Sequence, residues 1–348
     1  MFYMHPFPAK MKQFVMGIAI CFFTTGYGQV KVTPSKTANK IDITIRGKPF
    51  TSFIFPDTLE KPVLYPIYAA DGALITRGYP LAPRPGEPTD HPHHIGLWLN
   101  YENVNGFDFW NNSFNIPAAE KHRYGWIRTE KIVETTSGKT GSLTYAANWQ
   151  NQQGHVLLKE QTHFVFSADK EARIIDRITT LTAQEDVSFP DVKDGLLGLR
   201  VAHELQLPSA ETSSFTDDKG NVTVVKADTV PTGNYLTSEG YQGDSAWSSR
   251  GKWCLLYGKK GNDIISIAII DHPLNPGYPT YWHARGYGLF AANTLGQKIF
   301  SKGANQLNFK LQKGASVSFR YRVVIASGKK VLDKDAINKL SADFEEVR

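Results

Sequence analysis

Alternation of apolar and polar residues along most of this chain constrains its fold more than any other sequence feature. Side chains in a β-strand point alternately to the two faces of a sheet, so a period of two predicts strands with one buried face. Turn-forming residues lie between the alternating segments, as they do between antiparallel strands. The period is clearest in Ile41/Ile43/Ile45, Val156/Leu158/Thr162/Phe164/Phe166, Ala172/Ile174/Ile178, Val222/Val224, Ile265/Ile267/Ile269, Leu307/Phe309/Leu311 and Val317/Phe319/Tyr321/Val323/Ile325.

One helix is predicted, near the end of the chain. Between Asp333 and Phe344, the apolar residues Ala336, Ile337 and Leu340 recur at spacings of three and four. No helices alternate with the strands, and parallel sheets need such crossover helices, so the sheets should be antiparallel. We therefore expect an all-β protein, a large antiparallel β-sandwich with a short C-terminal helix.

The first 28 residues differ from the rest and match a secretory signal peptide. Lys10 and Lys12 precede an apolar stretch of about ten residues, and Gly26 and Gly28 follow it. A membrane-spanning helix needs about 20 apolar residues, so this stretch is too short to be one. We expect cleavage near Gly28, a periplasmic or secreted protein, and a single domain over residues 29–348.

Composition argues against several classes of partner. The net charge of +6 is modest for 348 residues, and Lys and Arg are interspersed with acids, so nucleic-acid binding is not expected. The mature chain has no stable membrane span, and its sequence indicates no protein partner. Cys254 would be the one cysteine left after cleavage, which rules out an internal disulfide. Its apolar neighbours predict a buried small residue.

Three of the ten histidines lie within four positions, at His91, His93 and His94. Imidazole titrates nearest neutral pH and is the commonest metal ligand, so acid-base or metal chemistry is sought here first. His91 and His93 point to the same side of an extended chain and could share a divalent metal. No tight metal motif surrounds them, so the cofactor is left open. Candidates for a third ligand are His94, His272, His283 and Glu204.

Charged residues interrupt three predicted strands, at Glu160, at Asp176 and at Arg200 with Glu204. Glu160 shares a face with apolar neighbours, where a charge costs several kcal/mol unless it is paired or functional. In a predicted strand over residues 199–207, Arg200 and Glu204 share one face, whereas His203 lies on the apolar one. Arg200 and Glu204 are either a solvated pair or part of a polar sheet face that holds a substrate. His203 is interpreted as a core histidine.

The tripeptide Asp-His-Pro occurs twice, at residues 90–92 and 271–273. Proline disfavours helix in the residue before it, so His91 and His272 should both be extended, at strand ends. Further along, His283 and Arg285 project to the same side of an extended segment. We interpret the two regions as halves of one divided site, with Arg200 and Glu204 as the floor between them.

These motifs together resemble a bacterial family labelled methane oxygenase PmoA-like, also described as a domain of unknown function. The resemblance spans about residues 40–328. It implies an exported or soluble protein connected with sugar metabolism, with a sandwich similar to the galactose-mutarotase supersandwich. A particulate methane monooxygenase subunit crosses the membrane, which this mature chain does not, so that activity is not expected. No catalytic residues come with the resemblance. The matching segments are Asp90–Trp98, Val104–Trp110, Gly243–Trp247, Asp271–Pro276 and Trp282–Arg285.

The favoured function is an enzyme that changes a small-molecule carbohydrate by acid-base catalysis, through epimerisation, elimination or hydrolysis. A histidine would act as general acid and Glu204 as general base, with an arginine stabilising negative charge. Tryptophans would stack on pyranose rings, and Arg, His and Asn would bind hydroxyls or a carboxylate. The predicted catalytic residues are His91, His93, Glu204 and His283, and the predicted substrate-binding residues are Arg200, Arg285, His272, Asn105, Trp98, Trp110 and Trp282.

Two alternatives come from other functional classes. One is a divalent-metal-dependent hydrolase or lyase built on His91 and His93. The other is a noncatalytic periplasmic carbohydrate-binding module, in which the histidines are hydrogen-bonded core residues and the aromatic residues serve packing. Such a module would bind saccharides without turnover, which distinguishes it from both enzymes.

Overall fold

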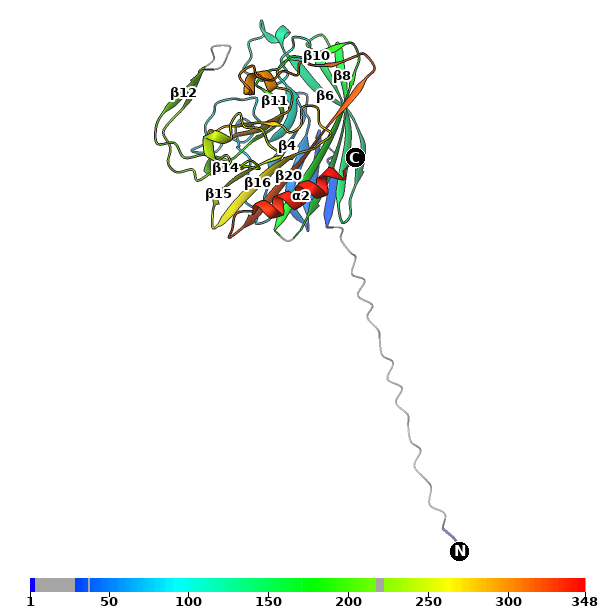
Figure 1. Ribbon diagram of the computed structural model, residues 1–348. Coiled ribbons are helices and arrows are strands. Elements are labelled where there is room, and N and C mark those ends of the chain that lie inside the picture. The colour runs from blue at the N-terminus through cyan, green and yellow to red at the C-terminus, as the bar shows by residue number, and fades with distance from the viewer. Residues whose placement is uncertain (4–28, 37, 170, 217–221, 348) are drawn as a thin grey trace.

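The computed structural model describes residues 1–3, 29–36, 38–169, 171–216 and 222–347, most of them in two large antiparallel sheets (Figure 1). Their apolar inner faces pack on each other, so the predicted all-β sandwich with a short C-terminal helix is confirmed. The predicted signal peptide lies almost wholly outside the described residues and stays a prediction, as does the single domain. No helix in the described ranges has the length and apolar character needed to cross a membrane.

The first sheet joins three distant parts of the chain. Its early strands form an antiparallel meander, and strands from residues 195–200 and 281–293 are added at the far side. Its spatial order is β1 (Val30–Pro34), β2 (Lys40–Ile45), β3 (Lys48–Ile54), β4 (Val63–Ile67), β5 (Leu97–Tyr101), β11 (Gly195–Arg200), β18 (Leu289–Asn293) and β17 (Tyr281–Ala284).

The second sheet contains the long strands. Cys254 lies in one of them and is fully buried and free, as predicted. The spatial order is β14 (Asn234–Thr237), β15 (Trp253–Lys260), β16 (Asp263–Asp271), β20 (Ser316–Gly328), β9 (Ala172–Ala183), β8 (Val156–Ala168), β7 (Gly141–Asn151) and β6 (Gly125–Thr136).

Two short ribbons and several short helices complete the described structure. The ribbons pair β10 (Val187–Phe189) with β19 (Phe309–Leu311) and β12 (Ser213–Thr216) with β13 (Val222–Val225). The helices are η1 (Lys121–Arg123), η2 (His203–Leu205), η3 (Gly243–Ala246), α1 (Gln297–Phe300) and α2 (Lys334–Glu345).

Glu160 of β8 lies inside the sandwich, fully paired. Its Oε1 accepts hydrogen bonds from Tyr145 (2.6 Å), Thr162 (2.6 Å) and Arg177 (3.0 Å), and its Oε2 accepts one from Trp149 (2.7 Å). Four donors offset the cost of taking the carboxylate out of water. The charge that interrupts this predicted strand is therefore structural.

The predicted C-terminal helix is confirmed as α2, which lies across the outer face of the second sheet (Figure 1). Asp333 is its N-cap, and its carboxylate accepts a hydrogen bond from the Ala336 amide at 2.8 Å. Ile337 and Phe344 are buried against apolar side chains of that face. α2 thus covers the part of the outer face that is formed mainly by β15, β16 and β20.

The outer face of the first sheet carries a separate apolar cluster. Leu97 and Leu99 of β5 point into the sandwich, so Trp98 between them points outward. The indole of Trp98 covers Gly198 of β11 together with Trp110. A Cβ at Gly198 would lie 2.5 Å from Trp98, so the close approach requires glycine.

Gly198→Ala should therefore destabilise the fold by about 1–3 kcal/mol, because both indole rings are fully buried and have no free space to move into. Gly138→Ala is the matched control, since its added Cβ would meet only the Thr140 carbonyl oxygen at 3.4 Å. Urea unfolding of the two variants and the parent measures the difference. Equal stabilities of the two variants would show that the Trp98 contact is not restrictive.

Candidate functional site

Arg77 organises the histidine segment on the outer face of the first sheet. Arg77 is 1% exposed, and burial together with the charge of Arg200 lowers its pKa to about 9. Nη1 also donates to the Asp90 carboxylate at 2.8 Å. The loop that carries the three histidines, residues 88–94, is therefore held by one side chain that lies outside it. The backbone oxygens that accept from Arg77 are those of Asp90 (2.7 Å), His91 (2.8 Å), His94 (3.2 Å) and Pro88 (3.3 Å).

Arg200, the last residue of β11, is a second buried guanidinium at the same loop. Its Nη2 donates to Asp90 Oδ1 at 2.9 Å, and its Nη1 lies 3.1 Å from His94 Nδ1. The sequence predicted Arg200 as a substrate-binding residue. The structure places it beneath the histidines, in contact with protein groups.

The histidines form a stack of aromatic rings with residues from other segments. His91 stacks on His94 at a centroid distance of 4.8 Å and on Tyr287 at 5.2 Å, and His94 stacks on Trp98 at 5.3 Å. His93 meets His94 edge to face at 4.3 Å. Because rings cover the faces of His91, its edge is the part that can meet a ligand.

Asp90 and His91 form a hydrogen-bonded pair at the outer end of this stack. Burial alone would raise the pKa of Asp90, but Arg200, the bond from His91 and Arg77 hold it well below its usual range. The carboxylate can only accept, so Nδ1 of His91 is the donor and Nε2 carries the lone pair. Burial and Arg200 lower the pKa of His91, which is therefore neutral at pH 7.

The Nε2 atom of His91 is available to a ligand. Among the described residues it has no hydrogen-bond partner, and the side chain is 20% exposed. His91 itself has φ 45°, so it occupies the left-handed region rather than the predicted extended strand end. Arg77 holds the backbone in this turn by binding the oxygens on both sides of it.

His283 and Arg285 also lie at this face. His283 of β17 points outward because Trp282 and Ala284 point into the sandwich. It is buried, and its Nδ1 lies 3.4 Å from a carboxylate oxygen of Asp194. The guanidinium of Arg285 lies 5.8 Å from the ring centre of Tyr287, which stacks on His91. The structure thus gathers His91, His93, Arg200, His283 and Arg285.

Glu204 lies outside this cluster, because the predicted strand over residues 199–207 is wrong. β11 ends at Arg200, and residues 203–205 form the 3₁₀ helix η2. Glu204 is half-exposed and pairs with Lys260 of the second sheet. His203, expected in the core, is partly exposed and binds Asp228 at 2.9 Å. Arg200 and Glu204 consequently share no sheet face.

His272 also lies elsewhere, so the second Asp-His-Pro motif is not half of a divided site. Its ring is buried edge to face against Phe344 of α2. Nδ1 accepts a hydrogen bond from the Leu274 amide at 3.1 Å. The preceding Asp271 accepts one from Asn275 at 2.7 Å, and its other carboxylate oxygen is buried without a partner. The motif ends β16 and supports the docking of α2.

The remaining predicted binding residues have structural contacts. Asn105 has φ 51° in a turn and donates to Glu185 at 2.9 Å. Trp98, Trp110 and Trp282 are at most 1% exposed, so they cannot stack on a sugar in this conformation. Trp282 lies inside the sandwich, and the other two lie under the histidine stack.

Sequence reasoning missed four residues of the cluster, Arg77, Asp90, Tyr287 and Lys61. Lys61 is buried beside Trp98, donates to the His93 carbonyl oxygen at 2.8 Å, and has its pKa lowered by burial to about 8. Asp90 belongs to the Asp-His-Pro motif, but its letters alone assign it no role. Only three-dimensional contact identifies the other three.

The described residues contain no group of three His, Cys, Asp or Glu side chains arranged to hold a metal ion. The predicted metal candidates His91 and His93 lie 5.6 Å apart, measured between ring centres. In the structure these rings contact each other and His94, and one of them is bonded to Asp90. Metal analysis of the purified protein is the direct test of that alternative.

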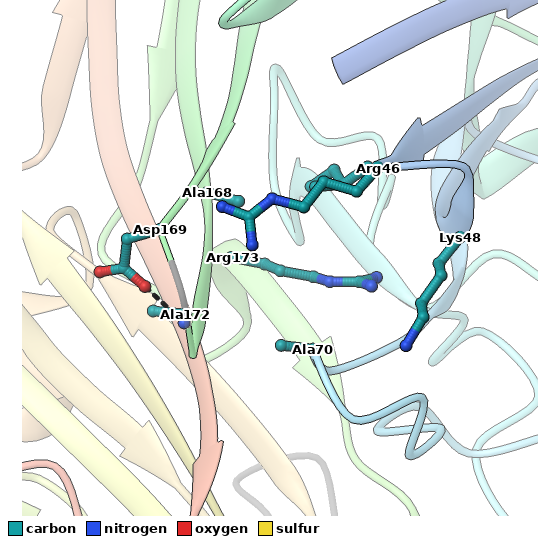
Figure 2. A pocket seen from close by; sticks show the side chains of 8 residues that line it. Arg46, Lys48, Ala70, Ala168, Asp169, Ala172 and Arg173 are labelled. Carbon is teal, nitrogen blue, oxygen red and sulfur yellow. Dashed lines mark hydrogen bonds between the residues drawn. The ribbon is translucent and has the colours of Figure 1, made fainter. Parts of the chain in front are cut away.

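A cavity lies away from the histidines, where the β2–β3 turn meets the β8–β9 turn (Figure 2). Arg46, Lys48 and Arg173 line it, and Arg173 donates to the Pro49 carbonyl oxygen at 2.7 Å. Figure 2 shows Asp169 bound to the Ala172 amide, at 2.8 Å. Arg46 and Lys48 are exposed, so solvent screens their charges.

Comparison with known proteins gives a family without a known activity. The model of DUF6807, a family of unknown function, matches residues 40–342. This match agrees with the expected domain of unknown function and gives no support to the methane-oxygenase label. A search of curated proteins finds no match.

Several solved structures match most of this chain, at low sequence identity and low TM-score. A candidate aldose 1-epimerase of Klebsiella pneumoniae is 12% identical with a TM-score of 0.41, covering 88% of this chain and 84% of its own. A galactose mutarotase related enzyme of Lactobacillus acidophilus is 7% identical with a TM-score of 0.33, and the match covers 87% of this chain and 99% of that enzyme. The GH36 alpha-galactosidase of Geobacillus stearothermophilus is 11% identical with a TM-score of 0.39. That match covers 86% of this chain and 41% of the galactosidase, so this chain spans less than half of that enzyme. Such scores establish no shared activity or substrate.

The buried Asp271 predicts a pH-dependent stability. Burial raises its pKa from 3.8 to about 7, so the folded state binds this proton more tightly than the unfolded state. Stability from this group is therefore present below pH 4 and is lost as pH rises towards 7. Asp271→Asn removes the titration. From pH 5 to pH 8 the free energy of unfolding of the variant should therefore rise by about 1–3 kcal/mol relative to that of the parent.

Urea unfolding of parent and variant at both pH values measures this gain. The Asn side chain keeps an oxygen that can accept the Asn275 hydrogen bond. A loss of packing in the variant lowers its free energy of unfolding by the same amount at both pH values, so it cancels when the two differences are compared. A free-energy difference that stays the same at pH 5 and pH 8 would show that Asp271 does not titrate in this range.

Proposed function

This chain belongs to DUF6807, a family of unknown function, and we propose that it binds a carbohydrate at the outer face of the first sheet and transfers a proton with His91. The observation that carries the proposal is the Asp90–His91 pair, with Nε2 available at the end of a rigid ring stack. An imidazole near neutrality and oriented by a carboxylate suits general-base catalysis.

The arrangement favours proton abstraction over glycoside hydrolysis. Hydrolysis in most glycosidase families needs a protonated carboxylic acid beside a second carboxylate. Asp90 cannot be that acid, because Arg200, His91 and Arg77 keep it ionised. A neutral His91 can accept a proton from a sugar hydroxyl or from a carbon next to a carbonyl. Asp90 then stabilises the imidazolium until the proton passes to the ring oxygen, which opens the ring and permits anomer exchange, or to the departing oxygen in an elimination. Epimerisation and elimination both begin in this way.

His283 and His93 take supporting positions in this proposal. His283 is buried beside Asp194, and burial together with Lys193 and Arg285 lowers its pKa well below the usual range. It is therefore a neutral hydrogen-bonding group at pH 7. His93 lies against His94 and is held through its carbonyl oxygen by Lys61. Export to the periplasm or beyond completes the proposal and is supported by the N-terminal sequence alone.

His91→Gln should lower turnover by about 10²–10⁴-fold and leave carbohydrate binding intact, since only the base is removed. His122→Gln is the matched control, because His122 is exposed on η1. NMR spectra of a panel of aldoses, uronates and glycosides report anomer exchange, epimers, eliminated products and hydrolysis together. Binding without turnover in the parent would contradict the enzyme and favour a carbohydrate-binding module.

The rate of the parent should fall in acid. His91 works as the neutral base, and its pKa lies below 6.5, so kcat/KM should hold through pH 6.5 and drop at lower pH. Asp90→Asn removes a charge that raises the pKa of His91. Its acid limb should move to lower pH while the rate falls. If kcat/KM already falls above pH 6.5, or if the pH of its fall is unchanged in Asp90→Asn, the base is a group other than His91.

A further inference from the structure

The proposed site contains more positive than negative charge. Arg77 and Arg200 are both fully buried as side chains, and both donate to the same oxygen, Oδ1 of Asp90, at 2.8 and 2.9 Å. A single carboxylate cannot neutralise two guanidinium groups, and uncompensated buried charge costs several kcal/mol. Arg285 and Lys61 add positive charge at the same face and Asp194 adds a carboxylate, so cations outnumber carboxylates in this cluster.

The neighbouring histidines do not offset this charge. The pKa of His93 is lowered mainly by burial, and to a smaller extent by the charges of His91, Lys61, Arg77 and Arg200. Burial and then Lys193 and Arg285 lower that of His283. Both rings therefore shed their protons in a region of positive potential. A bound anion would lower that potential and would be favoured electrostatically.

Arg285 is the cation best placed to meet such an anion. Its guanidinium lies 5.3 Å from the ring centre of Trp247 and 5.8 Å from that of Tyr287. Its backbone is fixed by hydrogen bonds to Leu289 (2.8 Å) and from Gly288 (2.9 Å). Cation–π contact and a tight turn reduce the entropy that the side chain loses when it binds a ligand. Arg285 remains partly exposed beside the His91 stack.

We propose that the substrate is a sugar acid and that Arg285 binds its carboxylate while His91 faces the carbon or hydroxyl that reacts. This proposal rests on the carbohydrate function proposed above and names its substrate class. A planar guanidinium fork matches a carboxylate through two parallel hydrogen bonds.

Calorimetry with matched ligands tests the assignment. The ligands are glucuronate with glucose, galacturonate with galactose, and glucose 6-phosphate as a more highly charged anion. The parent should bind each uronate at least about tenfold more tightly than its neutral partner. Arg285→Met should abolish this preference, and Arg285→Lys, which keeps the charge without the fork, should retain only part of it.

Arg46→Met is the control, because Arg46 lines the cavity of Figure 2 and represents the other cationic region that an acid could occupy. It should leave the preference unchanged. Loss of the preference in this variant instead of Arg285→Met would move the anion site to that cavity and overturn the proposal. Unfolding curves of all variants show whether each is folded, and the lysine variant remains informative where the methionine variant is unstable.

Further outcomes separate this proposal from the proposed function. Equal binding of uronates and neutral sugars would overturn the carboxylate assignment and leave the carbohydrate site standing. Tighter binding of glucose 6-phosphate than of glucuronate would assign the site to a phosphate ester and also overturn it. Failure of the parent to bind any sugar or sugar acid, with no turnover in the NMR panel, would overturn both.

Discussion

The buried guanidinium of Arg77 is the interaction on which the candidate site depends. A loop that turns sharply leaves backbone oxygens without partners, and burying them unpaired costs free energy for each one. Arg77 supplies donors to four such oxygens and to the Asp90 carboxylate. It fixes the position of His91 and the left-handed turn that presents it. The three histidines owe their arrangement to a residue outside their own segment.

A second consequence of this loop is the aromatic stack. Trp98 lies flat on the sheet because Gly198 leaves room beneath it, and His94, His91 and Tyr287 follow outward in sequence. Rings held on their faces can exchange protons and hydrogen bonds only at their edges. The stack therefore converts a histidine cluster into one directed group, His91, whose other nitrogen is already bound to Asp90.

The elements predicted from the sequence were those with a local period. The strands and α2 were found because burial repeats every two or every three to four residues along them. The prediction for residues 199–207 failed because an alternating pattern continued by chance after the chain left the sheet for η2. The two Asp-His-Pro tripeptides have identical letters, but Asp90 meets two arginines whereas Asp271 meets Asn275. Nothing within three residues encodes that difference.

The sequence by itself determined that the chain forms antiparallel sheets, that Cys254 is buried, and that histidines concentrate near residue 91. The tertiary structure alone decided which groups surround them. Asp90 and Arg200 are 110 residues apart in the chain and touch because β5 and β11 are neighbours in one sheet. Strand order is set by long-range pairing and loop closure, which leave no local mark in the sequence. For this reason the sequence prediction included Glu204 and His272, which lie outside the site, and missed Arg77 and Tyr287, which lie in it.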